Sequence, residues 1–61
     1  MLREKNEVIA VKCFASLVLD YEFSDYVSCR VLIDGWYDCG LIATSRDEAI
    51  EKFLSGKYKE Q

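Results

Sequence analysis

Apolar and polar residues alternate along most of the chain. From Ile9 to Phe23 every odd-numbered position is apolar or small, and the even-numbered positions include charged residues such as Lys12 and Asp20. A period of two residues predicts a strand with one buried face. The run is much longer than the usual strand of about six residues, so we expect a bend near Ala15.

The first half of this run also permits a second interpretation. Val8, Ala10 and Phe14 are apolar, so Lys12 and Ser16 could form the narrow polar stripe of a helix. The pattern leaves strand and helix open for this segment.

Two turn signals predict two further strands. Ser24-Asp25 favours a turn, and the alternating segment Tyr26–Ile33 follows it. Asp34-Gly35 strongly favours a hairpin, with Trp36–Ala43 as the returning strand. Together the three strands would form an antiparallel meander.

Two registers compete at this hairpin. A two-residue loop would pair Ile33 with Trp36 and place Asp38 on the apolar face, where an unpaired charge is costly. A three-residue loop that includes Ile33 moves every side chain to the other face and places Asp38 opposite Arg30. We expect the second register, because it buries no charge and forms a cross-strand ion pair. The inner face would then contain Val27, Cys29, Val31, Tyr37, Cys39, Leu41 and Ala43.

The same reasoning sets the register at the first turn. A three-residue loop over Ser24–Tyr26 pairs Leu19 with Val31 and Leu17 with Ile33. The outer face of the sheet would then have one charged row and one apolar row. These rows are Asp20–Arg30–Asp38 and Val18–Leu32–Trp36.

A helix is predicted for Arg46–Ser55. Ser45 is a suitable N-cap, Glu48 completes a capping box three residues later, and Gly56 is a C-terminal stop. The apolar stripe that would pack on the inner face consists of Ala49, Ile50, Phe53 and Leu54.

The predicted fold class is therefore α+β, with a three-stranded antiparallel meander sheet and one C-terminal helix packed on one face. We expect a single small domain over residues 1–61, with residues 1–7 as a frayed arm or the start of the first element, and a polar tail over 57–61.

Composition and charge narrow the function classes. The 61 residues are 51% hydrophobic and include no Pro, which indicates a packed chain rather than a disordered one. Eight basic and eleven acidic residues give a net charge of −3, which disfavours nucleic acid as the partner. The longest apolar run is too short to span a membrane. Three cysteines, an odd number, fit free thiols in a reducing cytoplasm better than a disulfide framework.

No pattern in the sequence predicts catalysis, a metal site or a cofactor. There is no His, and the cysteines lack the C-x-x-C spacing of zinc sites. Cys29 and Cys39 would lie opposite each other on the inner face, where two packed core thiols are favoured over a redox pair. Asp20 and Asp38 would flank Arg30, which keeps both carboxylates ionised and favours a solvated ion-pair row over an acid–base pair.

The outer face is the predicted contact surface. Trp, Tyr and Arg dominate the hot spots of protein interfaces, and a contiguous exposed apolar patch usually has a function. The alternative is that the N-terminal segment folds over this face. The candidate partner-binding residues are Trp36, Leu32, Val18, Ile42, Tyr26, Arg30, Asp20 and Asp38.

The long first strand predicts a second surface. Its first half would extend beyond its partner strand with an unpaired edge, which self-association or a fold back over the sheet would cover. The candidate self-association residues are Val8, Ala10, Lys12 and Phe14.

These observations favour a non-catalytic protein-binding module in the cytoplasm. We expect it to dock its outer face and acidic loops on a partner protein, in the manner of the small accessory and inhibitor proteins of phages and mobile elements, and to form homodimers if the unpaired edge self-associates. The alternative is a small nucleic-acid-binding domain that uses the sheet face and the basic end of the helix. Its phosphate contacts would be Lys52, Lys57 and Lys59.

Overall fold

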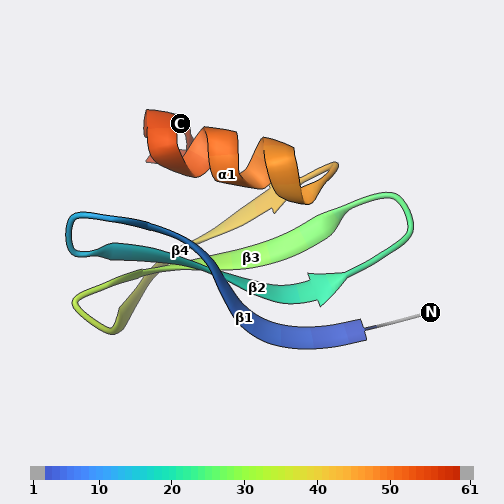
Figure 1. The fold of residues 1–61 in the computed structure, drawn as a ribbon, viewed down its shortest axis with the longest axis horizontal. Helices are drawn as coiled ribbons and strands as arrows, with labels where there is room; N and C mark the ends of the chain where they lie inside the picture. The colour runs from blue at the N-terminus through green and yellow to red at the C-terminus, as the bar shows by residue number, and fades with distance from the viewer. Residues whose placement is uncertain (1–2, 60–61) are drawn as a thin grey trace.

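The chain forms an antiparallel sheet with a helix lying across one face. The structure is a computed structural model that describes residues 3–59, with side chains described within 6–58. In chain order the elements are β1 (Arg3–Lys12), β2 (Ala15–Glu22), β3 (Val27–Ile33), β4 (Trp36–Ala43), α1 (Arg46–Ser55) and a short 3₁₀ helix, η1 (Lys57–Lys59). Figure 1 shows α1 above the sheet, with the meander of strands beneath it.

The predicted α+β class, the antiparallel sheet and the C-terminal helix are confirmed, but the sheet has four strands, in the order β1-β2-β3-β4, and not three. The predicted long strand is two strands, joined by a tight turn at Cys13-Phe14 where Cys13 has a φ of 56°. Of the two interpretations of residues 1–7, the structure favours the start of the first element over a frayed arm, because β1 begins at Arg3. Residues 1–2 and 60–61 of the predicted arm and tail lie outside the described residues.

The two hairpin turns support each other at one end of the sheet, at the left in Figure 1. The backbone N–H of Asp34, in the β3–β4 turn, donates a hydrogen bond of 3.0 Å to the carbonyl of Phe14, in the β1–β2 turn. This bond links the N-terminal hairpin to the C-terminal one and helps to offset the positive φ at Cys13, a conformation that L-residues other than Gly rarely adopt.

The β3–β4 hairpin combines features of both predicted registers. Ile33 pairs directly with Trp36 across a two-residue turn, in which Asp34 and Gly35 have φ values of 53° and 83°. Positive φ at both central residues is typical of a type I′ turn. A β-bulge at Asp38 then shifts the register by one residue, so that Tyr37 pairs with Leu32 and Cys39 pairs with Val31.

The bulge corrects the predicted side-chain positions at the turn. Cys39, Leu41 and Ala43 lie on the inner face as predicted, because beyond the bulge they pair with the inner-face residues of β3. Before the bulge the prediction is wrong. Tyr37 shares the outer face with Leu32, whereas Trp36 shares the inner side with Ile33. The predicted pairs of Asp38 with Arg30 and of Cys29 with Cys39 do not form, because Gly40 lies opposite Arg30 and Leu41 lies opposite Cys29.

The β2–β3 register is offset by two residues from the predicted one. Leu17 pairs with Val31 and Leu19 with Cys29, and a bulge at Asp20 follows. An offset of two residues preserves the face of every side chain, so the inner-face positions of Leu17 and Leu19 are as predicted. Val18, not Asp20, lies directly opposite Arg30.

The helix begins and ends at the predicted residues. The Ser45 hydroxyl accepts from the backbone N–H of Glu48 at 3.2 Å, and Gly56 ends the helix in the left-handed conformation with a φ of 79°. The Glu48 carboxylate does not close a standard capping box on Ser45. It accepts instead from the backbone N–H of Thr44 at 2.7 Å and from the Thr44 hydroxyl at 3.0 Å.

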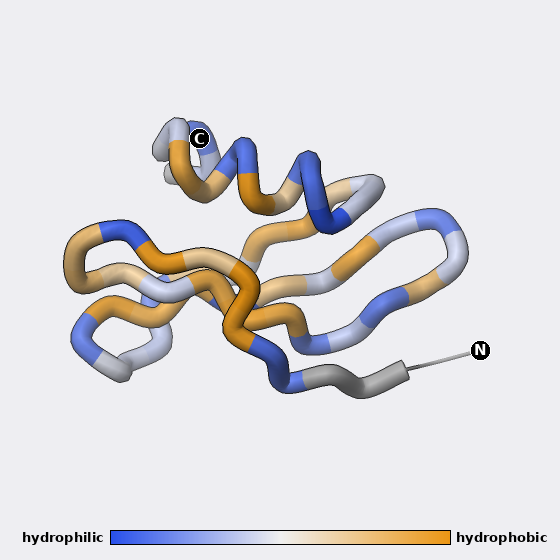
Figure 2. Tube along the Cα trace, in the orientation of Figure 1, coloured by the Kyte–Doolittle hydropathy of each residue, from blue (hydrophilic) through white to orange (hydrophobic). Residues whose placement is uncertain are grey.

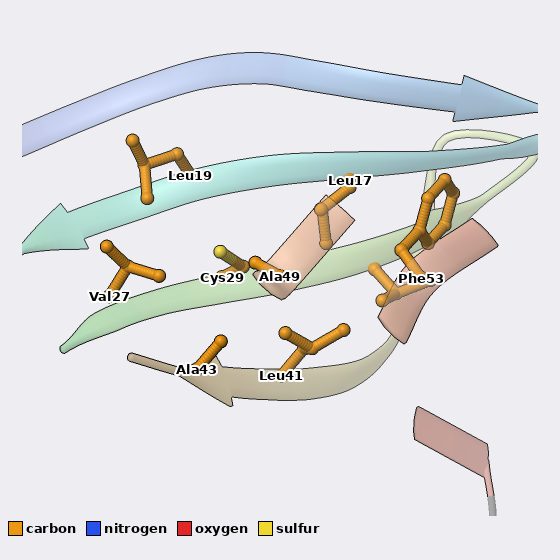
Figure 3. Close-up of a cluster of buried hydrophobic side chains, with 9 residues drawn as sticks. Leu17, Leu19, Val27, Cys29, Leu41, Ala43, Ala49 and Phe53 are labelled. Carbon is orange, nitrogen blue, oxygen red and sulfur yellow. The ribbon is translucent and has the colours of Figure 1, made fainter. Parts of the chain in front are cut away.

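The core lies between α1 and the inner face of the sheet. Its largest buried side chain is Phe53, which belongs to one cluster with side chains of β2, β3 and β4 such as Leu17 and Leu41 (Figure 3). In Figure 2 the apolar stretches run along the middle of the strands, and polar residues gather at the β2–β3 and β3–β4 turns and along the helix. The predicted helix stripe is correct for Ala49 and Phe53 but wrong for Leu54, which is 44% exposed.

Both ends of α1 are tied to β1. Arg46, in the first turn, forms an ion pair of 3.2 Å with Glu7 and a longer one of 3.8 Å with Glu22. At the other end the Lys12 ammonium donates to the carbonyl of Leu54 at 2.6 Å. A cation at a helix C-terminus is favourable because the last carbonyls have no partner within the helix. These contacts position β1 as an edge strand under the helix.

Candidate functional site

The candidate site is the outer face of the sheet, the face turned away from α1. The strand pairings place three rows of side chains across this face. The first row is Val11, Ser16, Leu32 and Tyr37; the second is Val8, Val18, Arg30 and Gly40; the third includes Tyr21, Ser28 and Ile42.

Apolar exposure on this face is concentrated on the two edge strands. Val8 and Val11 of β1, and Tyr37 and Ile42 of β4, are each more than half exposed. Between them, Val18 is only 6% exposed, because strands lie on both sides of it. The face is therefore a shallow apolar surface with its most accessible side chains at the two sides.

Arg30 occupies the centre of the face and is held in place by two oxygens. Its Nε atom lies 2.8 Å from Oδ1 of Asp20, although its N–H is not directed at that oxygen, so the contact is an ion pair rather than a well-formed hydrogen bond. A terminal guanidinium nitrogen donates to Oδ1 of Asn6 at 3.2 Å. These contacts orient the guanidinium before any partner binds, which lowers the entropic cost of using it in an interface.

The ion pair of Asp20 with Arg30 is as predicted, but its geometry is not. Asp20 reaches Arg30 from the bulge in β2, one strand away and not directly opposite. Asn6 of β1 provides the second oxygen that we expected from Asp38. The sequence contains no signal for Asn6, because its role depends on a strand that the alternation pattern did not separate from β2.

The structure brings most of the predicted partner-binding residues together. Val18, Leu32, Ile42, Arg30 and Asp20 lie on or beside the outer face. Trp36 is 80% exposed but lies on the inner side, since it pairs with Ile33.

Two more predicted partner-binding residues lie away from this group. Tyr26 lies at the β2–β3 turn, where its ring stacks on Phe23 at a centroid distance of 4.5 Å. Asp38 lies in the β4 bulge. Sequence reasoning missed Tyr37, Val8 and Val11 on this face, because the positions of all three depend on the bulges and the extra strand.

The four predicted self-association residues do not form one surface. Val8 lies on the outer face, and Ala10 packs against the core on the inner face. Lys12 is bonded to the helix, and Phe14 is 77% exposed in the β1–β2 turn. Two bulges interrupt β1, one between Glu4 and Glu7 and one between Val8 and Ala10. Bulges twist a strand edge and make it a poorer template for pairing with another chain.

Phe14 borders an apolar hollow at the turn end of the molecule. The hollow has a volume of about 360 Å³, and its lining includes Ile33, Phe53 and Tyr58. The Tyr58 ring stacks on Phe53 at a centroid distance of 5.8 Å and so forms one wall. The hollow is open to solvent at the Cys13-Phe14 turn and has mainly apolar walls.

The three cysteines form no disulfide and differ in exposure. Burial raises the pKa of the Cys29 thiol to about 11, and the nearby Asp20 carboxylate adds to this effect. A thiol with so high a pKa stays protonated at neutral pH and is a poor nucleophile. Cys29 is thus a core residue, whereas Cys13 is exposed in the β1–β2 turn.

Within the described part of the chain, no cluster of three or more His, Cys, Asp or Glu side chains could hold a metal ion. Among the same residues, no helix has the length and apolar character needed to cross a membrane.

Comparisons with known proteins identify no relative of this chain. The sequence matches no protein-family model, and neither the curated proteins nor the solved structures contain a significant match.

Proposed function

We propose that this protein is a non-catalytic protein-binding module that docks the outer face of its sheet on a partner protein. The observation that supports this most strongly is the group of exposed apolar side chains on that face, Tyr37 and Ile42 on one side and Val8 and Val11 on the other. Between them lies a pre-oriented Arg30. Tyr and Arg are enriched among the residues that dominate binding energy.

Charge at the rim of the face indicates what kind of partner would fit. Asp25, Asp34 and Asp38 are exposed in the turns and the bulge that border the sheet. We expect the partner to present an apolar patch flanked by basic side chains, because complementary rim charges speed association and suppress wrong partners. A small accessory or inhibitor protein, as phages and mobile elements encode, would act in this way. We place it in the cytoplasm because cysteines that form no disulfide persist best under reducing conditions.

Nucleic acid is the less favoured partner for this face. Among the described residues that the strand pairings place on it, Arg30 is the only basic one, and its charge is matched by Asp20. A phosphate-binding surface needs several uncompensated cations.

The test compares the partner affinity of variants in which exposed side chains of β4 are replaced by Thr, either on the outer face or on the inner side. Tyr37→Thr combined with Ile42→Thr removes the exposed side chains of β4 from the outer face, and Thr is well suited to strands. Trp36→Thr is the matched control, because it removes a larger exposed side chain from the same strand on the other side of the sheet. A partner captured with the wild-type protein would be purified and titrated with each variant by calorimetry.

We expect the double variant to weaken binding at least about a hundredfold, by roughly 3 kcal/mol for the loss of two hot-spot side chains. Trp36→Thr should bind within about twofold of the wild type, and all three proteins should have similar melting temperatures. Equal binding by the double variant, or loss of binding in Trp36→Thr alone, would show that the outer face is not the docking surface.

A further inference from the structure

The two edges of the sheet differ in their capacity to accept another strand. β1 is interrupted by two bulges, and contacts from Glu7 and Lys12 bind it to α1. β4 is regular from Cys39 to Ala43, beyond its single bulge. An edge without bulges is a template for strand addition, whereas bulges protect an edge from it. β4 is therefore the open edge among the described strands.

The outward backbone groups of β4 can be identified from its pairing with β3. Residues that flank a two-residue turn form a hydrogen-bonded pair, and hydrogen-bonded and non-hydrogen-bonded pairs then alternate along the ladder. By this alternation Cys39, Leu41 and Ala43 bond to β3, whereas Gly40 and Ile42 direct their N–H and C=O groups away from it. The Lys52 ammonium lies 3.4 Å from the Ile42 carbonyl, as expected for a carbonyl at the open edge.

A basic groove follows this edge on the helix side. It has a volume of about 240 Å³ and is lined by Gly40, Leu41, Ile42, Lys52, Lys57 and Tyr58. Among the described residues that line it, the two lysines are the only charged ones. Within residues 6–58 no carboxylate lies within ion-pair distance of either ammonium. Both lysines also line a second hollow, together with Glu48, Glu51 and Ser55.

The two sides of the β4 edge thus have different chemistry. On the helix side lie the ammonium groups of Lys52 and Lys57, and on the outer side lie the exposed apolar side chains of Tyr37 and Ile42. A strand directs successive side chains to opposite faces. A strand added to this edge would match it best if acidic residues alternated with apolar ones.

We propose that the β4 edge is a second binding site, which takes an extended protein segment with alternating acidic and apolar residues as a fifth strand. The outward N–H and C=O groups of Gly40 and Ile42 pair with the backbone of that segment. Its acidic side chains face Lys52 and Lys57, and its apolar side chains lie beside Tyr37 and Ile42. This goes beyond docking through the outer face, because it assigns the backbone edge of β4 and the basic groove beside it, with a different recognition chemistry. The two sites share only the side chains of Tyr37 and Ile42.

The test uses synthetic peptides in place of an unidentified partner. A capped peptide of about seven residues that alternates valine and glutamate is titrated into the ¹⁵N-labelled protein. One control peptide has the same composition in two blocks, a second has lysine in place of glutamate, and a third has alternate backbone nitrogens methylated so that they cannot donate hydrogen bonds. We expect only the alternating acidic peptide to shift the amide signals of Gly40 and Ile42 and to slow their hydrogen exchange.

Two variants test the role of charge. Lys52→Gln combined with Lys57→Gln should weaken binding of the alternating peptide roughly tenfold, as expected for the loss of two solvent-exposed charge pairs. Lys12→Gln is the control, because it removes a lysine charge near the same end of the helix but from β1, the opposite edge of the sheet from β4. It should leave the affinity unchanged, and added salt should weaken binding to the wild type more than to the double variant.

Several results would overturn the proposal. These are the absence of binding by the alternating peptide, equal binding by the block or methylated peptide, and amide shifts confined to β1. Protection of Gly40 and Ile42 that grows with protein concentration without peptide would assign the edge to a second copy of this chain instead. None of these outcomes bears on the outer-face variants, so failure of the edge site and failure of the proposed function are distinguishable.

Discussion

Glu48 connects the start of the helix to the strand before it. Its carboxylate accepts two hydrogen bonds from Thr44, the residue that follows β4. These bonds favour the ionised form and lower the pKa of Glu48 below its ordinary value of 4.5. The side chain therefore fixes the angle at which the chain leaves the sheet and enters α1.

Acid should weaken this connection. Because the pKa of Glu48 is lower in the folded chain than in the unfolded one, its contribution to stability is complete above the unfolded pKa and is lost as the pH falls through the folded pKa. We expect urea unfolding midpoints to fall between about pH 6 and pH 3, and to fall less steeply in Glu48→Gln, which keeps an acceptor oxygen but cannot be protonated in this range. Parallel loss of stability in both proteins would contradict this role.

Side-chain roles at the residue scale could be predicted only where they depend on neighbours in sequence. Ser45, Glu48 and Gly56 were predictable because capping involves residues a few positions apart. The pair of Asp20 with Arg30 was predicted from the right face but the wrong register. The contact between Asn6 and Arg30 spans 24 positions and two intervening strand pairings, so nothing local to Asn6 indicates it.

The β1–β2 turn is the element with the most backbone strain. Cys13 has a φ of 56° in a tight connection that contains neither Gly nor Asn. A left-handed conformation costs a non-Gly residue about 1–2 kcal/mol. The hydrogen bond from Asp34 to the Phe14 carbonyl and the pairing of the flanking strands hold the turn in place.

Glycine should be a more stable choice than alanine at position 13. We expect Cys13→Gly to be about 0.5–1 kcal/mol more stable than Cys13→Ala, because Gly adopts positive φ without steric cost but loses more backbone entropy on folding. The alanine variant is the control, since both changes remove the same exposed thiol. The measurement is the free energy of unfolding in urea. Equal stability of the two variants would show that Cys13 is not held at positive φ.

Most of the strands and the helix could be predicted from the sequence, but only some of the turns that connect them could. Alternation predicted strands over Ile9–Phe23, Tyr26–Ile33 and Trp36–Ala43, and helical spacing predicted α1. The division of the first segment was not predictable from turn chemistry, because Cys13-Phe14 is not a typical turn pair. The alternation continues through the turn, which conceals the reversal of the chain.

At the scale of the whole molecule, bulges decide which side chains share a face. If the turn alone set the register, only a longer loop could keep Asp38 off the apolar face. The structure keeps the short Asp34-Gly35 turn and accommodates Asp38 in a bulge, so that Leu41 and Ala43 still reach the core. A bulge has no strong sequence signature, and the face of Trp36 therefore could not be deduced.

The same arrangement separates two surfaces of opposite character. The outer face is apolar with acidic turns at its border, whereas the groove between β4 and the helix is basic. The net charge of −3 works against long-range attraction of an acidic segment, so recognition at the β4 edge depends on close contact with Lys52 and Lys57. Both surfaces include β4, whose register thus matters more for function than that of any other strand.

The most direct test of this account is the pairing of β3 with β4 in solution. Residues in non-hydrogen-bonded antiparallel pairs have Cα atoms about 4.5 Å apart, so their Hα atoms give strong nuclear Overhauser effects. The structure predicts such effects between Leu32 and Tyr37, between Arg30 and Gly40, and between Ser28 and Ile42. Strong effects between Val31 and Tyr37 and between Cys29 and Cys39, the non-hydrogen-bonded pairs of the register with a three-residue loop, would instead place Trp36 on the outer face and contradict the bulged register on which both proposed surfaces depend.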